Sequence, residues 1–190
     1  MRRIDFTPIR PWTPMLLKRL CIILLLVSQA AVICAQSRPA AAFQVKAAYL
    51  YNFTRFVEWE PDAYAAPDAP FIIGVLGNKL VGDYLQEIVR GEKVGNRPII
   101  VQQYRSISEV RNCRILFMSA AEASRARESL PEMTGKGILT VSDGESFLKW
   151  GGMIRFFNQE NKIKIQINSS AARSGQLQIS SKLLSVAAAY

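Results

Sequence analysis

Ser146 and Lys149 have the spacing of S-x-x-K, the acylation motif of penicillin-recognising enzymes. In that chemistry an activated serine attacks an acyl group and forms a covalent intermediate. The companion S-D-N and K-T-G motifs are absent from the sequence. The chain also has no histidine, which excludes Ser-His-Asp and Cys-His catalysis and histidine zinc sites. We therefore predict no catalytic residues and no enzyme activity.

Two other groups contain residue types that occur in ligand or ion sites. The run 74–78 begins Gly-Val-Leu-Gly after an apolar segment, but the full G-x-G-x-x-G pattern is absent, so a tight strand-to-helix turn explains it better. Glu58, Glu60 and Asp62 form an acidic cluster that either holds a cation or simply faces water. We predict no metal site and no cofactor.

The first 35 residues have the pattern of a secretory signal peptide. Five basic residues precede an almost uncharged apolar run at 20–33, which is too short to span a bilayer comfortably. Ala35 is the predicted cleavage position, so we expect a signal peptide over 1–35 and one exported domain over 36–190. A lipid on Cys34 and an uncleaved membrane anchor are the alternatives.

The charge of the chain gives little support for nucleic-acid binding. The 190 residues include 24 basic and 15 acidic side chains, a net charge of +9. Without the five basic residues and the one acidic residue of the leader, these become 19 and 14, a net charge of +5. The remaining basic residues are scattered and have no aromatic residues interleaved with them, so we predict no nucleic-acid partner.

Cysteine usage separates the leader from the domain. Cys21 and Cys34 lie in the leader, so Cys113 is alone in the exported domain and cannot form an intramolecular disulfide. The domain must therefore be held together by its hydrophobic core. We interpret Cys113 as a buried small apolar residue at the start of a strand, with intermolecular pairing or a redox role as the alternatives.

Alternating segments predict an α/β fold for the domain. A helix is expected over 41–59, ending before Pro61, and its two polar residues Asn52 and Arg55 need partners because most of the helix is apolar. We expect strands at 71–77, 98–104, 114–119 and 138–142, helices at 79–90 and 122–130, a loop at 91–97 and one helical turn at 146–150. This order favours a single domain with a mixed, mostly parallel sheet and helices on both faces.

The last 40 residues predict a β-hairpin followed by a closing helix. Ile163, Ile165 and Ile167 alternate with polar residues and follow a second strand at 153–157, with a turn at 158–161. Asn168 ends the strand and begins a helix. Gly175 makes one unbroken helix from there unfavourable, so the closing helix is expected over 180–188, with Leu183, Leu184, Val186 and Ala187 packing inward.

The two ends of the domain resemble the YfiR family, also called the DUF4154 domain. The helical segment VKAAYLYNFTRFVEWE at 45–60 is similar to the family's opening helix, with its aromatic end at Trp59. The segment INSSAARSGQLQISSKLLSVA at 167–187 is similar to the closing hallmark, which contains Asn168, Ser180 and Ser181. One extra residue, Gln176, departs from the closing pattern. We expect Asn52, Arg55, Trp59 and these closing residues to be structural.

The resemblance implies an exported periplasmic protein of a Gram-negative bacterium without catalytic activity. Founding members of the family hold back a membrane-bound diguanylate cyclase by binding its periplasmic part, and release of the cyclase raises cyclic di-GMP and favours biofilm growth. The best-known members carry disulfides in this domain, which this chain cannot form. The expected partner is thus the periplasmic region of an inner-membrane signalling protein, and the sequence leaves a homodimer open.

The hairpin offers a candidate face for this partner. Lys162, Lys164 and Gln166 point to the side opposite the isoleucines, and Phe156 or Phe157 is expected beside them. Basic groups around an exposed aromatic residue suit a protein interface, so we predict contacts from Phe157, Lys162 and Lys164. Two alternatives remain: a helix covers this face, or the protein is a small-ligand sensor that uses the crevice at the carboxyl ends of the strands.

Overall fold

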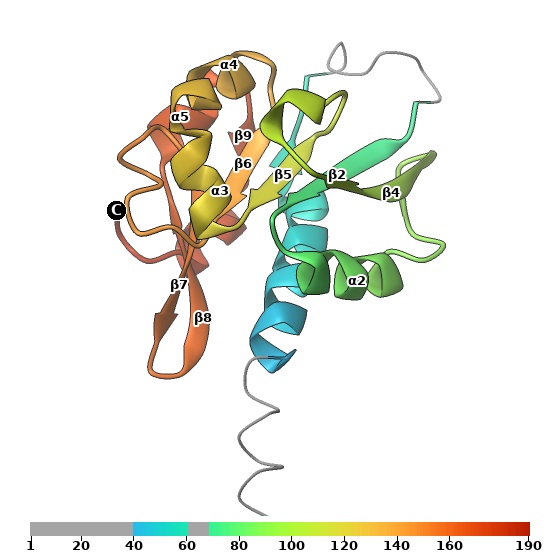
Figure 1. The fold of residues 1–190 in the computed structure, drawn as a ribbon, viewed down its shortest axis with the longest axis horizontal. Helices are drawn as coiled ribbons and strands as arrows, with labels where there is room; N and C mark the ends of the chain where they lie inside the picture. Colours follow the sequence, from blue (N-terminus) through green and yellow to red (C-terminus); the bar gives the residue numbers. More distant parts are fainter. Residues whose placement is uncertain (1–39, 61–68) are drawn as a thin grey trace, which may run out of the picture. The chain divides into compact units, whose positions relative to one another are not determined.

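The computed structural model describes residues 40–60 and 69–190 of the chain. The predicted signal peptide, Cys34 and Asp62 therefore lie outside the described residues. Residues 41–190 form one compact unit. Its strands and helices confirm the expected single α/β domain with a mixed, mostly parallel sheet (Figure 1).

The main sheet has seven strands in the order β3-β4-β2-β5-β6-β7-β8. Their bounds are Lys93–Val94 for β3, Arg97–Tyr104 for β4, Phe71–Leu76 for β2, Ile115–Met118 for β5, Leu139–Ser142 for β6, Ile154–Gln159 for β7 and Lys162–Ile167 for β8. The five strands from β4 to β7 are parallel, and β3 and β8 run antiparallel to their neighbours. Apolar runs buried on both faces, such as β2, produce this arrangement.

Helices cover both faces of the sheet. The first described helix spans residues 40–56; the others are α2 at Lys79–Ile88, α3 at Ala120–Arg125, α4 at Leu130–Gly135, α5 at Ser169–Ser174 and α6 at Ser181–Val186, with 3₁₀ turns at Ile107–Glu109 and Arg127–Ser129. Helix 40–56 and α2 pack with Ile73, Phe117 and Phe156 in the larger core cluster. On the opposite face, α3 and α4 pack with Leu116 and Met118. Each face therefore has its own apolar layer.

Gly74 within β2 and Gly77 in the turn before α2 each have a steric reason. Gly77 has φ +82, a conformation that side-chain-bearing residues rarely adopt, and Asn78 caps α2 by accepting a hydrogen bond from the Val81 amide. A Cβ atom on Gly74 would lie 2.6 Å from the Tyr104 ring. These glycines serve a tight turn and close packing, as the sequence indicated.

Several element boundaries differ from the prediction. The expected helix over 41–59 ends at 56, because Val57–Glu58 forms strand β1 and pairs antiparallel with β9 at Gln178–Ile179. The expected loop 91–97 contains the short strand β3. The single predicted helix at 122–130 is three short helical pieces, and residues 145–151 form hydrogen-bonded turns rather than a helix. In the first two cases, the pairing of β1 with β9 and of β3 with β4 outweighed local propensity.

The closing segment is also divided differently. Asn168 caps α5, Gly175 ends it, and β9 separates it from α6, which confirms that no single helix runs through. Within α6 only Leu183 is fully buried, whereas Leu184 and Val186 are 39% and 61% exposed. The expectation that all four apolar residues pack inward was wrong, because six helical residues bury only one narrow stripe.

Candidate functional site

Strands β7 and β8 form the predicted hairpin, and their register decides which side chains share a face. The turn is Glu160–Asn161, both with positive φ, and Asn158 belongs to β7 instead of the turn. Phe156 is opposite Ile165 and Phe157 is opposite Lys164. Because side chains alternate along a strand, Phe156 points into the core and Phe157 lies on the other face beside Lys164.

Phe156 anchors the inward face of this hairpin. Its side chain is 1% exposed, and its ring centroid lies 5.7 Å from that of Tyr49 and 6.2 Å from that of Phe53, both on helix 40–56. Phe117 of β5 completes this aromatic cluster at 6.1 Å. The hairpin base is thus fixed to the helix and to the centre of the sheet.

Arg155, Phe157, Lys162 and Lys164 form what we call the outward hairpin face. Lys162 and Lys164 are exposed and Phe157 is half-buried. The Arg155 guanidinium lies 5.7 Å from the centroid of the Phe157 ring and donates to Gln166 Oε1 at 3.0 Å. No salt bridge involves either lysine within residues 40–60 and 69–190. This face therefore combines an aromatic ring with uncompensated positive charge, and the alternative of a helix covering the two lysines does not hold.

Arg55 and Trp59 tie the start of the domain to neighbouring loops. Arg55 is exposed, contrary to the expected position in or near the core; its guanidinium donates to the Tyr51 hydroxyl and lies 3.9 Å from Glu92. Trp59 Nε1 donates to the carbonyl of Gly137 at 3.1 Å, and its ring packs edge-on against Phe71. Asn52 is half-buried and makes no side-chain hydrogen bond with another described residue, so its expected partner is not found.

The closing residues act at helix ends. Asn168 Oδ1 accepts from the Ala171 amide at 3.1 Å, and its Nδ2 donates to the Leu148 carbonyl at 3.3 Å. Ser180 Oγ accepts from the Leu183 amide at 3.3 Å and so caps α6, of which Ser181 is the exposed first residue. These contacts are those of local capping groups.

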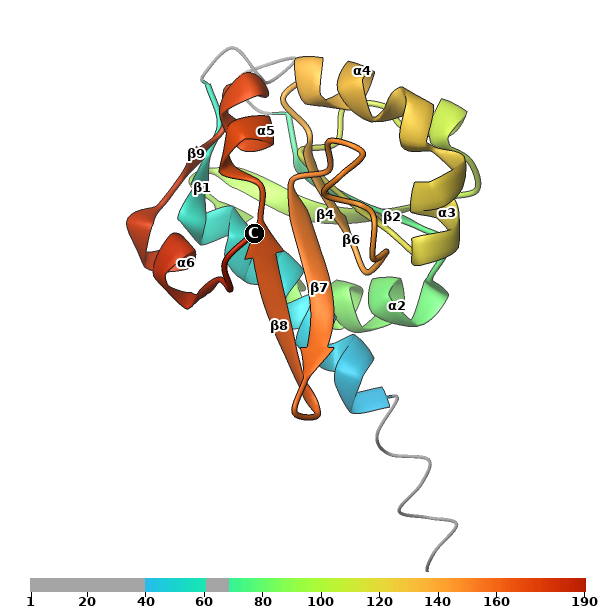
Figure 2. The same cartoon turned by 90° about the vertical axis from the view of Figure 1, so that its left-hand side faces the viewer.

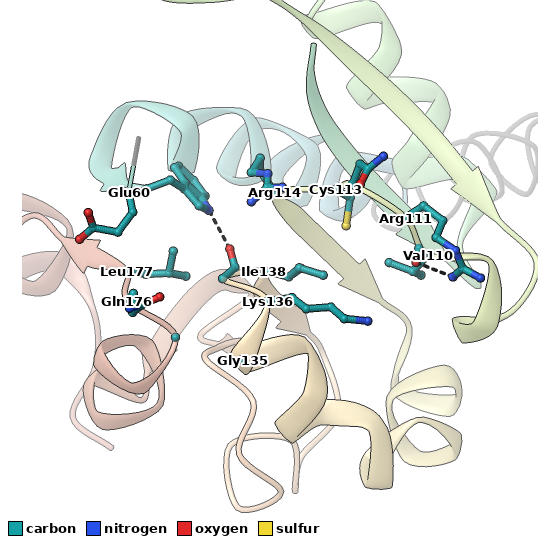
Figure 3. A pocket seen from close by; sticks show the side chains of 14 residues that line it. Glu60, Val110, Arg111, Cys113, Arg114, Gly135, Lys136, Ile138, Gln176 and Leu177 are labelled. Carbon is teal, nitrogen blue, oxygen red and sulfur yellow. Dashed lines mark hydrogen bonds between the residues drawn. The ribbon is translucent and has the colours of Figure 1, made fainter. Parts of the chain in front are cut away.

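A pocket of about 440 Å³ lies at the amino ends of β5 and β6 (Figure 3). Arg111 and Glu60 lie at opposite ends of it, with Arg114, Lys136 and Cys113 between them. Two of its charged side chains have partners in the protein: Arg111 donates to two carbonyls of its own loop, and Lys136 pairs with Glu132 at 2.6 Å. This pocket is at the opposite edge from the crevice that the sequence suggested for a small ligand.

Cys113 is completely buried beside that pocket, which confirms the interpretation of a small apolar residue at a strand start. Burial raises the pKa of its thiol to about 12, and the nearby Arg114 charge offsets only part of this effect. Burial also raises the pKa of Tyr104 to about 12. Since the thiolate is the reactive form, this cysteine is chemically inert at neutral pH.

A second hollow, of about 520 Å³, opens at the carboxyl end of β6, beside the distal half of β7. Lys46 of helix 40–56 and Asp143, which follows β6, meet there in a salt bridge of 2.6 Å. Lys46 is 10% exposed and Asp143 is 26% exposed. Asp143 Oδ1 and Arg155 Nε are buried without a hydrogen-bond partner. Sequence analysis missed this pair, because 97 positions separate its members and neither has a local signal.

The remaining sequence patterns gain no chemistry from the fold. Ser146 and Lys149 lie on the turn after β6, and no hydrogen bond joins them in the described part of the chain. Among the described residues, no group of three or more histidine, cysteine or acidic side chains is placed to hold a metal ion. No helix in the described ranges is both long and apolar enough to cross a bilayer.

Comparison with known proteins gives one family and no individual relative. The family model DUF4154, described as YfiR/HmsC-like, matches residues 43–188, from helix 40–56 to the residues after α6. No curated protein matches the chain. The family match spans more than three-quarters of the 190 residues and contains both segments that resembled the family. The chain therefore belongs to the YfiR/HmsC-like family, and this membership implies a periplasmic regulator of diguanylate cyclase signalling.

Proposed function

We propose that this protein binds the periplasmic region of an inner-membrane diguanylate cyclase reversibly and represses it. Family membership supports the signalling context and the kind of partner. The outward hairpin face is the surface that we propose contacts the cyclase. The protein acts by binding, and release of the cyclase raises cyclic di-GMP and favours biofilm growth.

The main observation in favour of this contact site is that Phe157 and Lys164 are cross-strand neighbours on one exposed face. A half-buried aromatic ring supplies apolar contact area at a small cost in side-chain entropy, and Arg155 already orders the ring by packing over it. Lys162 and Lys164 add positive charge that is not neutralised within the described chain. An acidic surface on the cyclase would therefore associate with this face rapidly and with the correct orientation.

The test is a charge reversal within the full chain. A strain lacking the gene receives the wild-type protein, Lys164→Glu, or the double variant Lys162→Glu with Lys164→Glu. Lys182→Glu, at an exposed position of α6, is the matched control for net charge. We expect the wild type and the control to lower cellular cyclic di-GMP, and the hairpin variants to leave it at the level of the deletion strain.

Folding must be measured alongside. Both hairpin lysines are exposed, so circular dichroism and the melting temperature should match the wild type. Folded hairpin variants that still repress would remove this face from the interface. Unchanged cyclic di-GMP after deletion of the gene would contradict the proposed repression itself.

A small-ligand sensor is the second candidate, and the pocket at the amino ends of β5 and β6 favours it. Its volume of about 440 Å³ lies within the range of small-molecule sites. Native mass spectrometry of protein isolated from the periplasm would detect a retained molecule. The sensor would be supported if the wild-type protein carries a bound molecule and the folded Trp59→Ala variant does not. If every preparation has only the mass of the protein itself, the result would argue against a sensor.

A further inference from the structure

The pocket of about 440 Å³ at the amino ends of β5 and β6 has a lining of unequal charge. Arg111, Arg114 and Lys136 line it, and Glu60 is the one acidic side chain among the described residues that do so. The lining therefore has a net charge of +2. The balance stays positive when the Glu132 carboxylate, which pairs with Lys136 from outside the lining, is counted as well. This charge favours an anion over a neutral or cationic molecule of the same size.

The positive groups lie toward one end of the pocket. Figure 3 shows the Lys136 side chain extending toward the end at which Arg111 lies, with Glu60 at the opposite end. The hydrogen bond from Lys136 lowers the pKa of Glu132, and the charge of Arg111 lowers it further, so both cations are near the same carboxylate. Arg114 adds a third positive charge from the buried wall. Because like charges repel each other, an anion bound at this end would relieve the repulsion.

Lys136 and Arg111 are accessible to a ligand. The side chains of Lys136 and Glu132 are 61% and 69% exposed, and an exposed ion pair contributes little because water screens both charges. Arg111 is exposed as well, and it donates to the carbonyls of Ser108 and Val110, which are neutral acceptors. Both cations can therefore turn to a ligand without leaving a buried polar group unpaired.

Much of the remaining lining is apolar and fixed in place. Val110, Ile138 and Leu177 are buried, and their side chains belong to the wall of the pocket. Trp59 is half-buried, and its ring is held by the hydrogen bond from Nε1 to the Gly137 carbonyl at 3.1 Å. An apolar group bound here would cover ordered side chains, so little side-chain entropy would be lost on binding.

Short loops at two helix ends frame the pocket. Figure 2 shows α4 and α5 next to each other, and the residues at or after their ends, 135–138 and 175–177, line the pocket. Gly137 has φ +63, and a Cβ atom on it would lie 3.5 Å from the carbonyl oxygen of Gly175. The two loops therefore pack against each other, and the pocket is formed before a ligand binds.

We propose that this pocket binds a small organic anion, with its carboxylate or phosphate group at Arg111 and Lys136 and its apolar part against Trp59. The inference rests on the small-ligand sensor, the second candidate for the function, and names the class of its ligand. Both cations would donate charge-assisted hydrogen bonds to the anionic group. The Trp59 ring would supply apolar contact area.

Matched probes separate charge from shape. Isothermal titration of the protein isolated from the periplasm compares phenylacetate with phenylacetamide, which has the same ring and nearly the same size but no charge. We expect phenylacetate to bind about tenfold more tightly, and added salt to weaken its binding but not that of the amide. Phenyl phosphate in the same titration shows whether a phosphate or a carboxylate is preferred. Equal binding of phenylacetate and phenylacetamide, or no binding of either anion at about 10 mM, would overturn the inference.

Variants of the lining test where the anionic group binds. Lys136→Met removes one cation and should weaken phenylacetate binding about tenfold, whereas Glu60→Gln removes the acidic side chain and should strengthen it. Lys149→Met, at an exposed position outside the lining, is the matched control and should bind like the wild type. All three positions are exposed, so the melting temperature should not change. Unchanged phenylacetate binding by folded Lys136→Met would contradict the inference.

Native mass spectrometry separates this inference from the sensor itself. A molecule retained by the wild-type protein is released and identified. An organic acid that Lys136→Met fails to retain would support the inference. A neutral or cationic molecule would leave the sensor in place and overturn the anion class. Retention of an acid without any change of cyclic di-GMP on deletion of the gene would contradict only the proposed repression.

Discussion

The two ends of the parallel strands both carry charged and polar groups, but they satisfy them differently. At the amino ends, Arg111, Lys136 and Trp59 bind carbonyls or a carboxylate of the same domain. At the carboxyl ends, Asp143 lines an open hollow, and its Oδ1 has no hydrogen-bond partner among the described residues. Buried polar groups normally have partners, so the unpaired Asp143 Oδ1 distinguishes the carboxyl end from the satisfied groups named at the amino end.

The largest expected effect separates the two faces of the hairpin at the carboxyl end. Phe156→Ala removes a ring that is 1% exposed and contacts three other aromatic residues, so we expect it to lower the free energy of unfolding by about 3–5 kcal/mol. Phe157→Ala, at a half-buried ring on the other face, should cost less than about 1 kcal/mol. Urea denaturation measures both. Equal costs would mean that the outward face is part of the core.

The next effect compares a salt bridge from each end. Lys46→Met leaves the Asp143 carboxylate without the ammonium group that pairs with it in a partly buried site, and we expect a loss of about 2 kcal/mol. Lys136→Met, which breaks an exposed pair with Glu132 near the amino ends, should cost at most about 0.5 kcal/mol. Adding Asp143→Asn to Lys46→Met should recover part of the loss. Similar values for the two lysines in denaturation experiments would remove the contrast between the ends.

The third effect is a pH dependence at the amino end. The pKa of Cys113 is about 12 in the folded protein against 9.0 for an ordinary thiol, so the unfolded chain ionises first as the pH rises. This stabilisation is complete below pH 9 and is lost between pH 9 and 12; at pH 10 the loss is on the order of 1 kcal/mol. Denaturation at pH 8 and pH 10 tests it, with Cys113→Ala as the control that should reduce the difference to the smaller part that comes from the raised pKa of Tyr104. An unchanged slope in this variant would contradict the burial of the thiol.

The smallest effect concerns one hydrogen bond. Trp59→Phe keeps the apolar ring against Phe71 but removes the Nε1 donor to the Gly137 carbonyl, so we expect a loss of about 1 kcal/mol. Thermal melting should show it as a shift of a few degrees. Loss of repression by a folded variant, without this shift, would place Trp59 in an interface and weaken the contrast between the two ends.

Fold class could be predicted because the patterns that determine it are local. The uninterrupted apolar run at 71–76 predicted a buried parallel strand, and the alternation at 162–167 predicted a half-exposed one. The caps at Asn78 and Asn168 were also recognisable, since a capping side chain bonds an amide three residues away. The strand at Val57–Glu58 was not, because its partner β9 lies more than 100 positions later and the helical pattern runs into it without a break.

The sequence by itself determined the α/β class, the order of the main parallel strands, the single cysteine of the domain, the alternation that separates Phe156 from Phe157, and the resemblance to the family. Only the tertiary structure decided which of these aromatic rings lies in the core, because a strand's two faces are equivalent until one of them packs against a helix. It also brought Lys46 next to Asp143. Strand β6 ends where only two of its residues, Val141 and Ser142, have paired with β7. Both features depend on contacts between distant segments, and such contacts have no signature in the local order of residues.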